Sequence, residues 1–173
     1  MNDAADMKYM ECCLKESLRL YSTVPNIVRK TAEEIELNGI KIPAGISVCI
    51  QMYGLHRNPE HFPDPLTYDP DRFQPERCSG RHPYAFIPFS AGPRNCLGLS
   101  ELCDSFILHL ILMRIYICKI GQKFASLEAK VIISSLLRKF CFSYSPHRDP
   151  LQIDADLVLK YIEGVPLIVS TRY

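Results

Sequence analysis

The sequence lacks several features that would point to common kinds of protein. Its 20 basic and 19 acidic side chains nearly cancel, so no overall charge attracts nucleic acid or an anionic membrane surface. No Cys-x-x-Cys pair, Gly-x-Ser-x-Gly or His-Glu-x-x-His occurs, which leaves a zinc protein or a serine hydrolase without its usual motif. A hydrophobic core is nevertheless expected, because 47% of the 173 residues are apolar.

The sequence opens Met-Asn-Asp-Ala-Ala-Asp with no basic segment before an apolar run, so we expect no secretory leader in it. We therefore expect a reducing compartment, where disulfides are rare. Most of the eight cysteines should then act as small buried apolar side chains. A helical pattern begins close to Met1, and we expect this start to be a truncation of a longer chain.

Apolar residues recur at helical spacing over 7–21 and predict an α-helix. One side of it carries Met7, Met10, Leu14, Leu18 and Tyr21, and the other carries Tyr9, Cys12, Cys13 and Leu20. Since both sides are apolar, we expect the helix to be largely buried. Glu16 and Arg19 are three residues apart on the second side, so they should form a poorly solvated ion pair.

A β region is predicted over 27–52. Apolar residues alternate on each side of Asn38-Gly39, and Asn-Gly in that setting is a strong signal for a two-residue hairpin turn. The turn residues Pro43-Ala44-Gly45 lead into a further strand near 46–50 and then a short helix near 53–57.

A long coil is predicted next, because eight of the thirteen prolines lie between Pro59 and Pro93 and interrupt helical and strand patterns alike. Such a coil within a compact domain is expected where the loop itself is functional. Further on, helical patterns occupy 99–117 and 120–140, and two apolar runs around Glu163-Gly164 predict a terminal hairpin over 157–170. The expected fold class is mainly α with small antiparallel β hairpins (α+β).

The coil ends in Phe-Ser-Ala-Gly-Pro-Arg-Asn-Cys-Leu-Gly at 89–98. A haem iron bound by thiolate needs a cysteine on a rigid loop with little bulk nearby, and we assign Cys96 as that ligand. Gly92 and Gly98 would let the backbone approach the porphyrin and offer N–H groups to the sulfur. Arg94 is a cation suited to a haem propionate, and Phe89 is an aromatic wall. Alone, arginine is usually a surface residue and phenylalanine a core residue, so only the combination makes the pattern specific.

The spacing Phe-x-x-Gly-x-Arg-x-Cys-x-Gly is similar to the haem-binding signature of cytochromes P-450. Glu16 and Arg19 match the Glu-x-x-Arg motif of that family, and Asp69-Pro70-Asp71-Arg72-Phe73 resembles the segment that supplies a second arginine. The resemblance implies that Glu16, Arg19 and Arg72 form one buried triad that holds the coil before the haem loop. It also implies that 1–173 is the carboxy-terminal portion of a single cytochrome P-450 domain, with its K helix at 7–21, the coil and haem loop at 59–98 and its L helix at 120–140.

Finer detail resembles the fatty-acid hydroxylases of family 4. The likeness lies in Val24-Pro25 to Arg29-Lys30, in Tyr53-Gly54-Leu55-His56-Arg57 and in the run from Arg81-His82-Pro83 to Gly92. It implies that Arg29 meets a haem propionate and that segments 24–28 and 163–165 border the substrate pocket. His56 and His82 are expected to be structural, since neither is required as a second haem ligand.

The resemblance also implies an activity for the full-length form. That form would be a haem-dependent monooxygenase that inserts one oxygen atom into a lipophilic or fatty-acid-like substrate, with electrons from a reductase of the NADPH-cytochrome type. It would lie on the cytosolic face of the endoplasmic reticulum membrane through an amino-terminal anchor. The anchor and the oxygen-activating helix are expected upstream of this sequence, so we expect no catalytic residue here and an inactive isolated chain. The alternative is a non-catalytic truncated or mis-spliced product without haem.

The sequence leaves the family pattern directly after Cys96. The family continues from the cysteine into Ile-Gly-Gln-Lys-Phe-Ala, which here begins only at Ile120, so 97–119 reads as an insertion. This segment is too short and too interrupted for a membrane span. We expect it to be a retained intron or a gene-model error translated in frame. In the alternative, 99–117 is itself the helix after the cysteine and the second helix is displaced.

Overall fold

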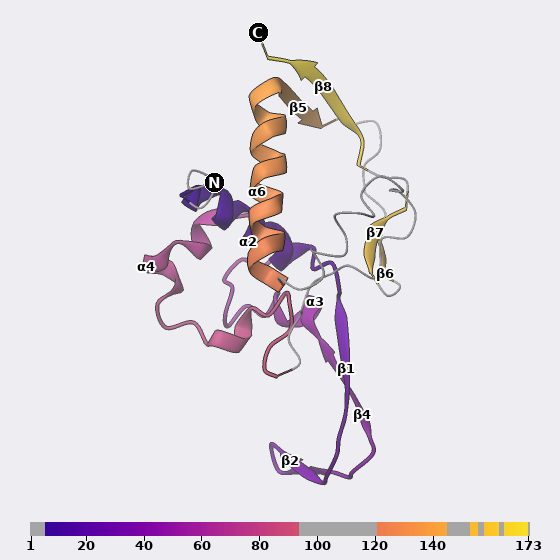
Figure 1. Cartoon of the computed structure of the whole chain (residues 1–173). Coiled ribbons are helices and arrows are strands. Elements are labelled where there is room, and N and C mark those ends of the chain that lie inside the picture. Colours follow the sequence, from indigo (N-terminus) through magenta and orange to yellow (C-terminus); the bar gives the residue numbers. More distant parts are fainter. Residues whose placement is uncertain (1–5, 94–120, 145–152, 156–157, 163–164, 173) are drawn as a thin grey trace.

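The computed structural model describes residues 6–93, 121–144, 153–155, 158–162 and 165–172. Two long helices, α2 (Lys8–Leu20) and α6 (Gly121–Lys139), lie against each other in the middle of the molecule (Figure 1). Around them, the described residues form four small antiparallel sheets of two strands each. The expected class of helices with small antiparallel hairpins is confirmed.

Helix α2 occupies nearly the range predicted for it, but its buried side differs from the expectation. Cys12, Glu16, Arg19 and Leu20 are its buried residues, because the proline-rich coil packs on this side. The side with Met7, Met10, Leu14, Leu18 and Tyr21 is only half-buried or exposed, and even on the buried side Tyr9 is 60% exposed. The expectation of a largely buried helix is therefore wrong for the part that the structure describes, where α6 covers the side of Leu14 and Leu18 only in part.

Strands β1 (Asn26–Lys30) and β4 (Ser47–Gln51) pair antiparallel along their whole length. They extend away from the two long helices, as Figure 1 shows. The short helix α3 (Met52–Leu55) follows β4 directly, and Met52 is almost completely buried. The ladder therefore leads the chain out from the helices and back again, so that the coil after α3 begins close to the end of α2.

The far end of this ladder carries the hairpin of β2 (Ile35–Leu37) and β3 (Ile40–Ile42). Asn38 and Gly39 between them have φ values of 51° and 80°. A type I′ turn requires positive φ at both central positions, which asparagine and glycine tolerate best. The predicted Asn-Gly hairpin is confirmed.

The coil after α3 is ordered by short helical segments. The 3-10 helix Pro70–Phe73, helix α4 (Pro75–Cys78) and the 3-10 helix Pro83–Ala85 each begin at proline, where the missing N–H removes no helical hydrogen bond. The core cluster consists of Cys12, Phe62, Phe73 and Ala85. It lies between α2 and the coil, immediately before the predicted haem loop.

The last strands pair differently from the prediction. Strand β8 (Leu167–Thr171) pairs with β5 (Phe140–Tyr144), which begins where α6 ends, and β7 (Leu159–Tyr161) pairs with β6 (Ile153–Ala155). The predicted hairpin over 157–170, in which the last two runs pair with each other, is therefore wrong. No glycine or proline separates α6 from β5, so the pattern predicts one helix to residue 140 and does not reveal the strand that pairs with β8.

Five cysteines fall within the described residues, and all five are free thiols. Cys12 is buried, Cys13 and Cys78 are half-buried, and Cys49 and Cys141 are exposed. The expectation that most thiols are buried is wrong for these five. The two exposed ones lie on β4 and β5, which belong to two-stranded sheets and so have little neighbouring structure to cover them.

Candidate functional site

The predicted triad is the most deeply buried group of charges in the described residues. Glu16 and Arg19 have no exposed surface, and Arg72 is 5% exposed. Arg19 binds the Glu16 carboxylate twice, from Nε to Oε2 at 2.7 Å and from Nη2 to Oε1 at 2.8 Å. Nε of Arg72 lies 3.5 Å from Oε1 of Glu16. The structure thus brings together the three residues that the sequence analysis grouped, with the bidentate geometry that makes arginine–carboxylate pairs strong.

The triad also binds the backbone of the coil. Nη1 of Arg19 donates to the carbonyl oxygens of His56 and Pro65, at 3.0 and 2.7 Å. The Asp69 N–H donates to Oε1 of Glu16 at 2.9 Å. Because these donors and acceptors are buried or partly buried, losing a partner would be destabilising. With a further bond from Arg19 Nη2 to the Thr67 carbonyl oxygen at 3.2 Å, helix α2 fixes the coil backbone at four residues over 56–69.

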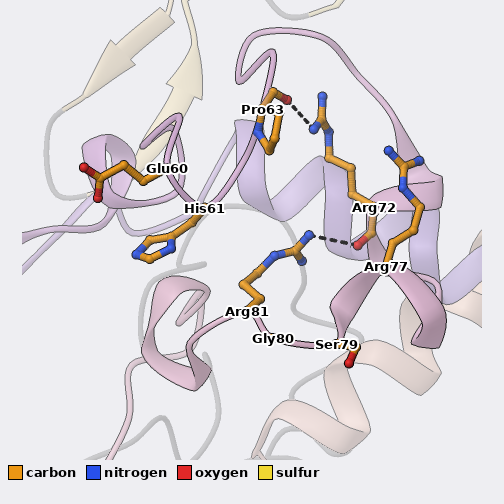
Figure 2. Close-up of a pocket in the computed structure, with 8 residues that line it drawn as sticks. All are labelled: Glu60, His61, Pro63, Arg72, Arg77, Ser79, Gly80 and Arg81. Carbon is orange, nitrogen blue, oxygen red and sulfur yellow. Dashed lines mark hydrogen bonds between the residues drawn. The ribbon is translucent and has the colours of Figure 1, made fainter.

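Arg72 extends the same network to the far side of the coil (Figure 2). Its guanidinium donates to the carbonyl oxygens of Pro63 and Asp64, the second at 2.9 Å. Its own carbonyl oxygen accepts from Nη2 of Arg81 at 3.0 Å. The Arg81 guanidinium lies over the ring of Phe62, 4.6 Å from the ring centroid, a favourable cation–π distance. Arg81 is thus a fourth member of the network, and no motif in the sequence indicates this role.

A cavity of about 390 Å³ opens beside these arginines and is lined in part by His61, Arg72, Arg77 and Arg81 (Figure 2). Its three guanidinium groups already have partners. Arg72 binds the triad and two carbonyls, Arg77 binds Asp69 at 3.1 Å, and Arg81 binds the Arg72 carbonyl. We interpret the cavity as a gap between structural arginines.

The coil continues into the predicted haem loop, of which residues up to 93 are described. Ser90 and Gly92 have φ values of 63° and 79°, a conformation that glycine adopts freely and serine rarely. Nη2 of Arg29 in β1 donates to Oγ of Ser90 at 3.1 Å. The strand and the loop entry are therefore joined at the residue with the strained backbone. Three predicted site residues lie outside the described residues: Cys96, Arg94 and Gly98.

A second cavity, of about 480 Å³, separates the loop entry from the two long helices. Leu14 and Leu18 of α2, Leu127 of α6, and Phe86 and Phe89 of the coil line it together with polar residues. Phe89 therefore borders a cavity between the loop entry and the two long helices.

An ion pair crosses from α2 to α6 at the edge of this cavity. Nζ of Lys130 binds Oε2 of Glu11 at 2.9 Å, and Nζ of Lys15 binds Oε1 at 2.7 Å. Lys130 is 5% exposed. The hydrogen bonds from Lys15 and then Lys130 lower the pKa of Glu11 from 4.5 to about 2. Both cations are thus held by one ionised carboxylate.

His56 is completely buried and binds the loop entry. Its Nε2 accepts from the Ile87 N–H at 2.9 Å, and its Nδ1 lies 3.4 Å from Oγ of Ser22. The ring packs against Phe86, with centroids 5.1 Å apart. Burial, with Arg19 and Arg57 nearby, lowers the pKa of His56 to about 4. His56 is therefore neutral at physiological pH.

His82 also binds backbone, because its Nδ1 accepts from the Tyr84 N–H at 3.2 Å at the start of a 3-10 helix. The two histidines thus occupy structural positions in the described chain, one buried and one exposed.

The described half of the loop fits a flat prosthetic group with anionic substituents. A β-carbon added at Gly92 would meet no atom within 4 Å, so the space beside this backbone is open. Arg29 provides a cation at the loop entry and Phe89 an apolar surface. A glycine backbone and an aromatic ring suit the flat face of a haem, and a cation suits its propionates.

Comparison with known proteins agrees with this fit. Residues 1–114 match the family model described as Cytochrome P450 (here written cytochrome P-450). Cytochrome P-450 4c3 of Drosophila melanogaster is 41% identical over 172 residues, which are 99% of this chain and 28% of that protein. Cytochrome P-450 4V2 of Rattus norvegicus is 38% identical over 173 residues, 100% of this chain and 29% of that protein. The chain therefore spans less than a third of the length of these relatives.

Solved structures show the same fold. A cyanobacterial protein, CYP120A1 with bound retinoic acid, superposes with a TM-score of 0.81 at 24% identity and covers 99% of this chain and 34% of its own. A cytochrome P-450 haem domain superposes with a TM-score of 0.80 at 26% identity and covers 99% of this chain and 33% of its own. This chain belongs to the cytochrome P-450 family, and its relatives carry family 4 names. Haem is the cofactor of this family.

Two features of the site have no clear signal in the sequence. His56 is an ordinary member of a short motif, and only its burial shows that it binds the Ile87 N–H. Glu11 and Lys130 are far apart in the chain, so no local spacing predicts their contact.

In the described residues, no helix is long and apolar enough to cross a membrane.

Proposed function

We propose that this chain provides the thiolate side of a haem-dependent monooxygenase that hydroxylates a lipophilic, fatty-acid-like substrate. The observation that carries the proposal is the buried network of Glu16, Arg19 and Arg72, which binds the coil directly before the signature loop. In this proposal Cys96 is the axial ligand of the iron. When bound, haem supplies the iron centre at which dioxygen is activated.

The protein residues hold and orient the cofactor. Arg94 and Arg29 are the proposed partners of the propionates, and the Arg29–Ser90 hydrogen bond places this cation at the loop entry. Gly92 and Gly98 let the backbone approach the porphyrin and offer N–H groups to the sulfur. Such hydrogen bonds withdraw charge from a thiolate and so adjust how strongly it donates to the metal.

The substrate class, electron donor and location are parts of the same proposal, supported by the family 4 names of the relatives. Segments 24–28 and 163–165 would border the substrate. Electrons would come from a reductase of the NADPH-cytochrome type at the endoplasmic reticulum membrane. Because the chain matches less than a third of each relative, we expect the isolated chain to bind haem without turning over substrate.

The test is the absorption spectrum of the reduced, carbon-monoxide-bound protein after reconstitution with haem. The unchanged chain should show the long-wavelength Soret band that thiolate ligation gives, and Cys96→Ser should abolish it. Cys141→Ser is the matched control, since Cys141 is an exposed free thiol on β5. It should leave the band unchanged.

Two outcomes contradict the proposal. Haem uptake that Cys96→Ser does not alter would mean that another residue holds the iron. No haem uptake by the unchanged chain, with its helices intact by circular dichroism, would instead favour the non-catalytic alternative.

A further inference from the structure

The histidine at position 56 links two parts of the site, the buried triad and the entry of the loop. Its carbonyl oxygen accepts from Nη1 of Arg19 at 3.0 Å, and its Nε2 accepts from the Ile87 N–H at 2.9 Å. Arg19 belongs to the buried triad. Ile87 is two residues before Phe89, where the haem signature begins. A single residue therefore bonds to the anchor of the coil and to the entry of the loop.

The hydrogen bonds determine the tautomer of this imidazole. A backbone N–H can donate only to a ring nitrogen that carries no proton, so Nε2 must be the acceptor and the proton must lie on Nδ1. Nδ1 faces Oγ of Ser22, 3.4 Å away, and Ser22 is itself completely buried. The imidazole thus receives one hydrogen bond from the loop and directs its own proton toward the segment after α2.

The surroundings keep the ring neutral. Burial is the main cause that lowers its pKa to about 4, and two nearby cations, Arg19 from α2 and Arg57 after α3, lower it further. The Glu16 carboxylate is bound to Arg19 by two hydrogen bonds. An imidazolium would have no lone pair for the Ile87 N–H, so neutrality is a condition of this contact.

We propose that His56 is a positioning residue for the haem loop. Its neutral Nε2 fixes the Ile87 amide relative to Arg19 and so sets where the segment leading to Cys96 begins. The step from a fixed Ile87 to a well-placed thiolate rests on the proposed function. The hydrogen bond is a separate contribution from the packing of the ring on Phe86, which any flat side chain of this size would supply.

Two substitutions separate the hydrogen bond from the packing. In His56→Gln the side-chain amide oxygen reaches about as far as Nε2 and can accept from the Ile87 N–H. His56→Phe keeps a flat ring against Phe86 but has no acceptor. One variant therefore keeps the acceptor without the ring, and the other keeps the ring without the acceptor.

The first measurement needs no haem. Hydrogen exchange of the Ile87 amide, followed by NMR in the full chain, should be slow in the unchanged chain and in His56→Gln. It should be about tenfold faster or more in His56→Phe, because the partly buried N–H loses the ring nitrogen that accepts its hydrogen bond. Equal exchange rates in both variants would overturn the proposal and leave His56 as a packing residue.

The second measurement uses the haem-loaded chain. In His56→Phe, part of the reduced, carbon-monoxide-bound protein should lose the spectrum of thiolate ligation. His56→Gln should keep the thiolate spectrum of the unchanged chain. Thiolate spectra identical in all three proteins would overturn the link to Cys96. If the unchanged chain binds no haem, the proposed function fails, and the exchange measurement still decides whether His56 positions Ile87.

Where His56→Phe does not fold, Ser22→Ala takes its place. It removes the partner of Nδ1 and should raise the Ile87 exchange rate, although it changes no atom that touches the loop. Unchanged Ile87 exchange in Ser22→Ala would show that this amide does not depend on how the His56 ring is held, and would overturn the proposal.

Discussion

Single residues decide whether charges can remain inside this fold. Glu16, Arg19 and Arg72 are almost completely removed from water, and unpaired charges in that position would be strongly destabilising. The carboxylate is satisfied by the Arg19 fork and by the Asp69 N–H, while both guanidinium groups reach backbone carbonyls. The residues therefore stabilise the coil as a set, because each one supplies a charged or hydrogen-bonding partner that another needs.

Loss of Arg72 should show this dependence. We expect Arg72→Met to lower the free energy of unfolding by about 3 kcal/mol, since the pair with Glu16 and the bonds to Pro63 and Asp64 are lost together. We also expect the reconstituted variant to lose its haem on gel filtration. Urea unfolding followed by circular dichroism measures the first effect.

Arg77→Met is the matched control for this measurement. Arg77 is paired with Asp69 at 3.1 Å, but its side chain is 53% exposed, so its loss should lower the free energy of unfolding by less than about 1 kcal/mol. If the two substitutions lowered the free energy of unfolding equally, the burial of the triad would not account for its contribution to stability.

At the level of elements, the contact between α2 and α6 depends on an ion pair that spans the chain. Lys130 is nearly buried and binds Glu11, which also binds Lys15. A buried lysine without a carboxylate would be destabilised by its own charge. The pair therefore fixes the side of α6 that faces α2 and the cavity behind Phe89.

This pair predicts a dependence of stability on pH. The pKa of Glu11 is lowered from 4.5 to about 2 in the folded chain, so the folded state holds the proton more weakly than the unfolded state. The stabilisation is therefore complete above about pH 4.5 and is lost as the pH falls toward 2. Glu11 is 41% exposed, so solvent screening limits the effect to about 1 kcal/mol.

Glu11→Gln should remove this contribution. The difference in free energy of unfolding between the unchanged chain and the variant should be constant near neutral pH and shrink toward zero as the pH falls below 4.5. Lys15→Gln, which removes only the exposed partner on the same helix, should have a smaller effect, about 0.3–0.5 kcal/mol. A difference that does not change with pH would exclude ionised Glu11 as its cause.

For the whole molecule, the decisive segment is 97–119, which lies outside the described residues. Helix α6 begins at Gly121, and the family pattern resumes at Ile120. Deleting 97–119 joins Cys96 to Ile120 and places Gly121 at the spacing that Gly98 has now. If the segment is a retained intron, the shortened chain should restore the loop of the family.

We expect the shortened chain to take up more haem per protein and to give a larger fraction of thiolate spectrum than the unchanged chain. Sequencing the spliced transcript is the independent check, because mature messenger should lack the bases that encode 97–119. Reduced haem uptake after the deletion, with the segment present in abundant transcript, would instead support 99–117 as the helix after the cysteine.

Several features of the fold follow from neighbouring residues alone. The hairpin turn at Asn38 and Gly39 is determined by two residues that tolerate positive φ. The short helices of the coil begin at prolines, whose φ suits a first helical position. The triad was predictable as a group only through the family resemblance, because Arg72 is distant from Glu16 and Arg19 in the chain.

Other features were decided only by the tertiary structure. The partner of β8 is β5 and not the preceding strand, the buried side of α2 is the one that faces the coil, and His56 binds a backbone N–H 31 positions away. The physical reason is the same in each case. Turn and helix signals act within a few residues, whereas strand partners, burial and long-range hydrogen bonds depend on which distant segments the folded chain brings into contact.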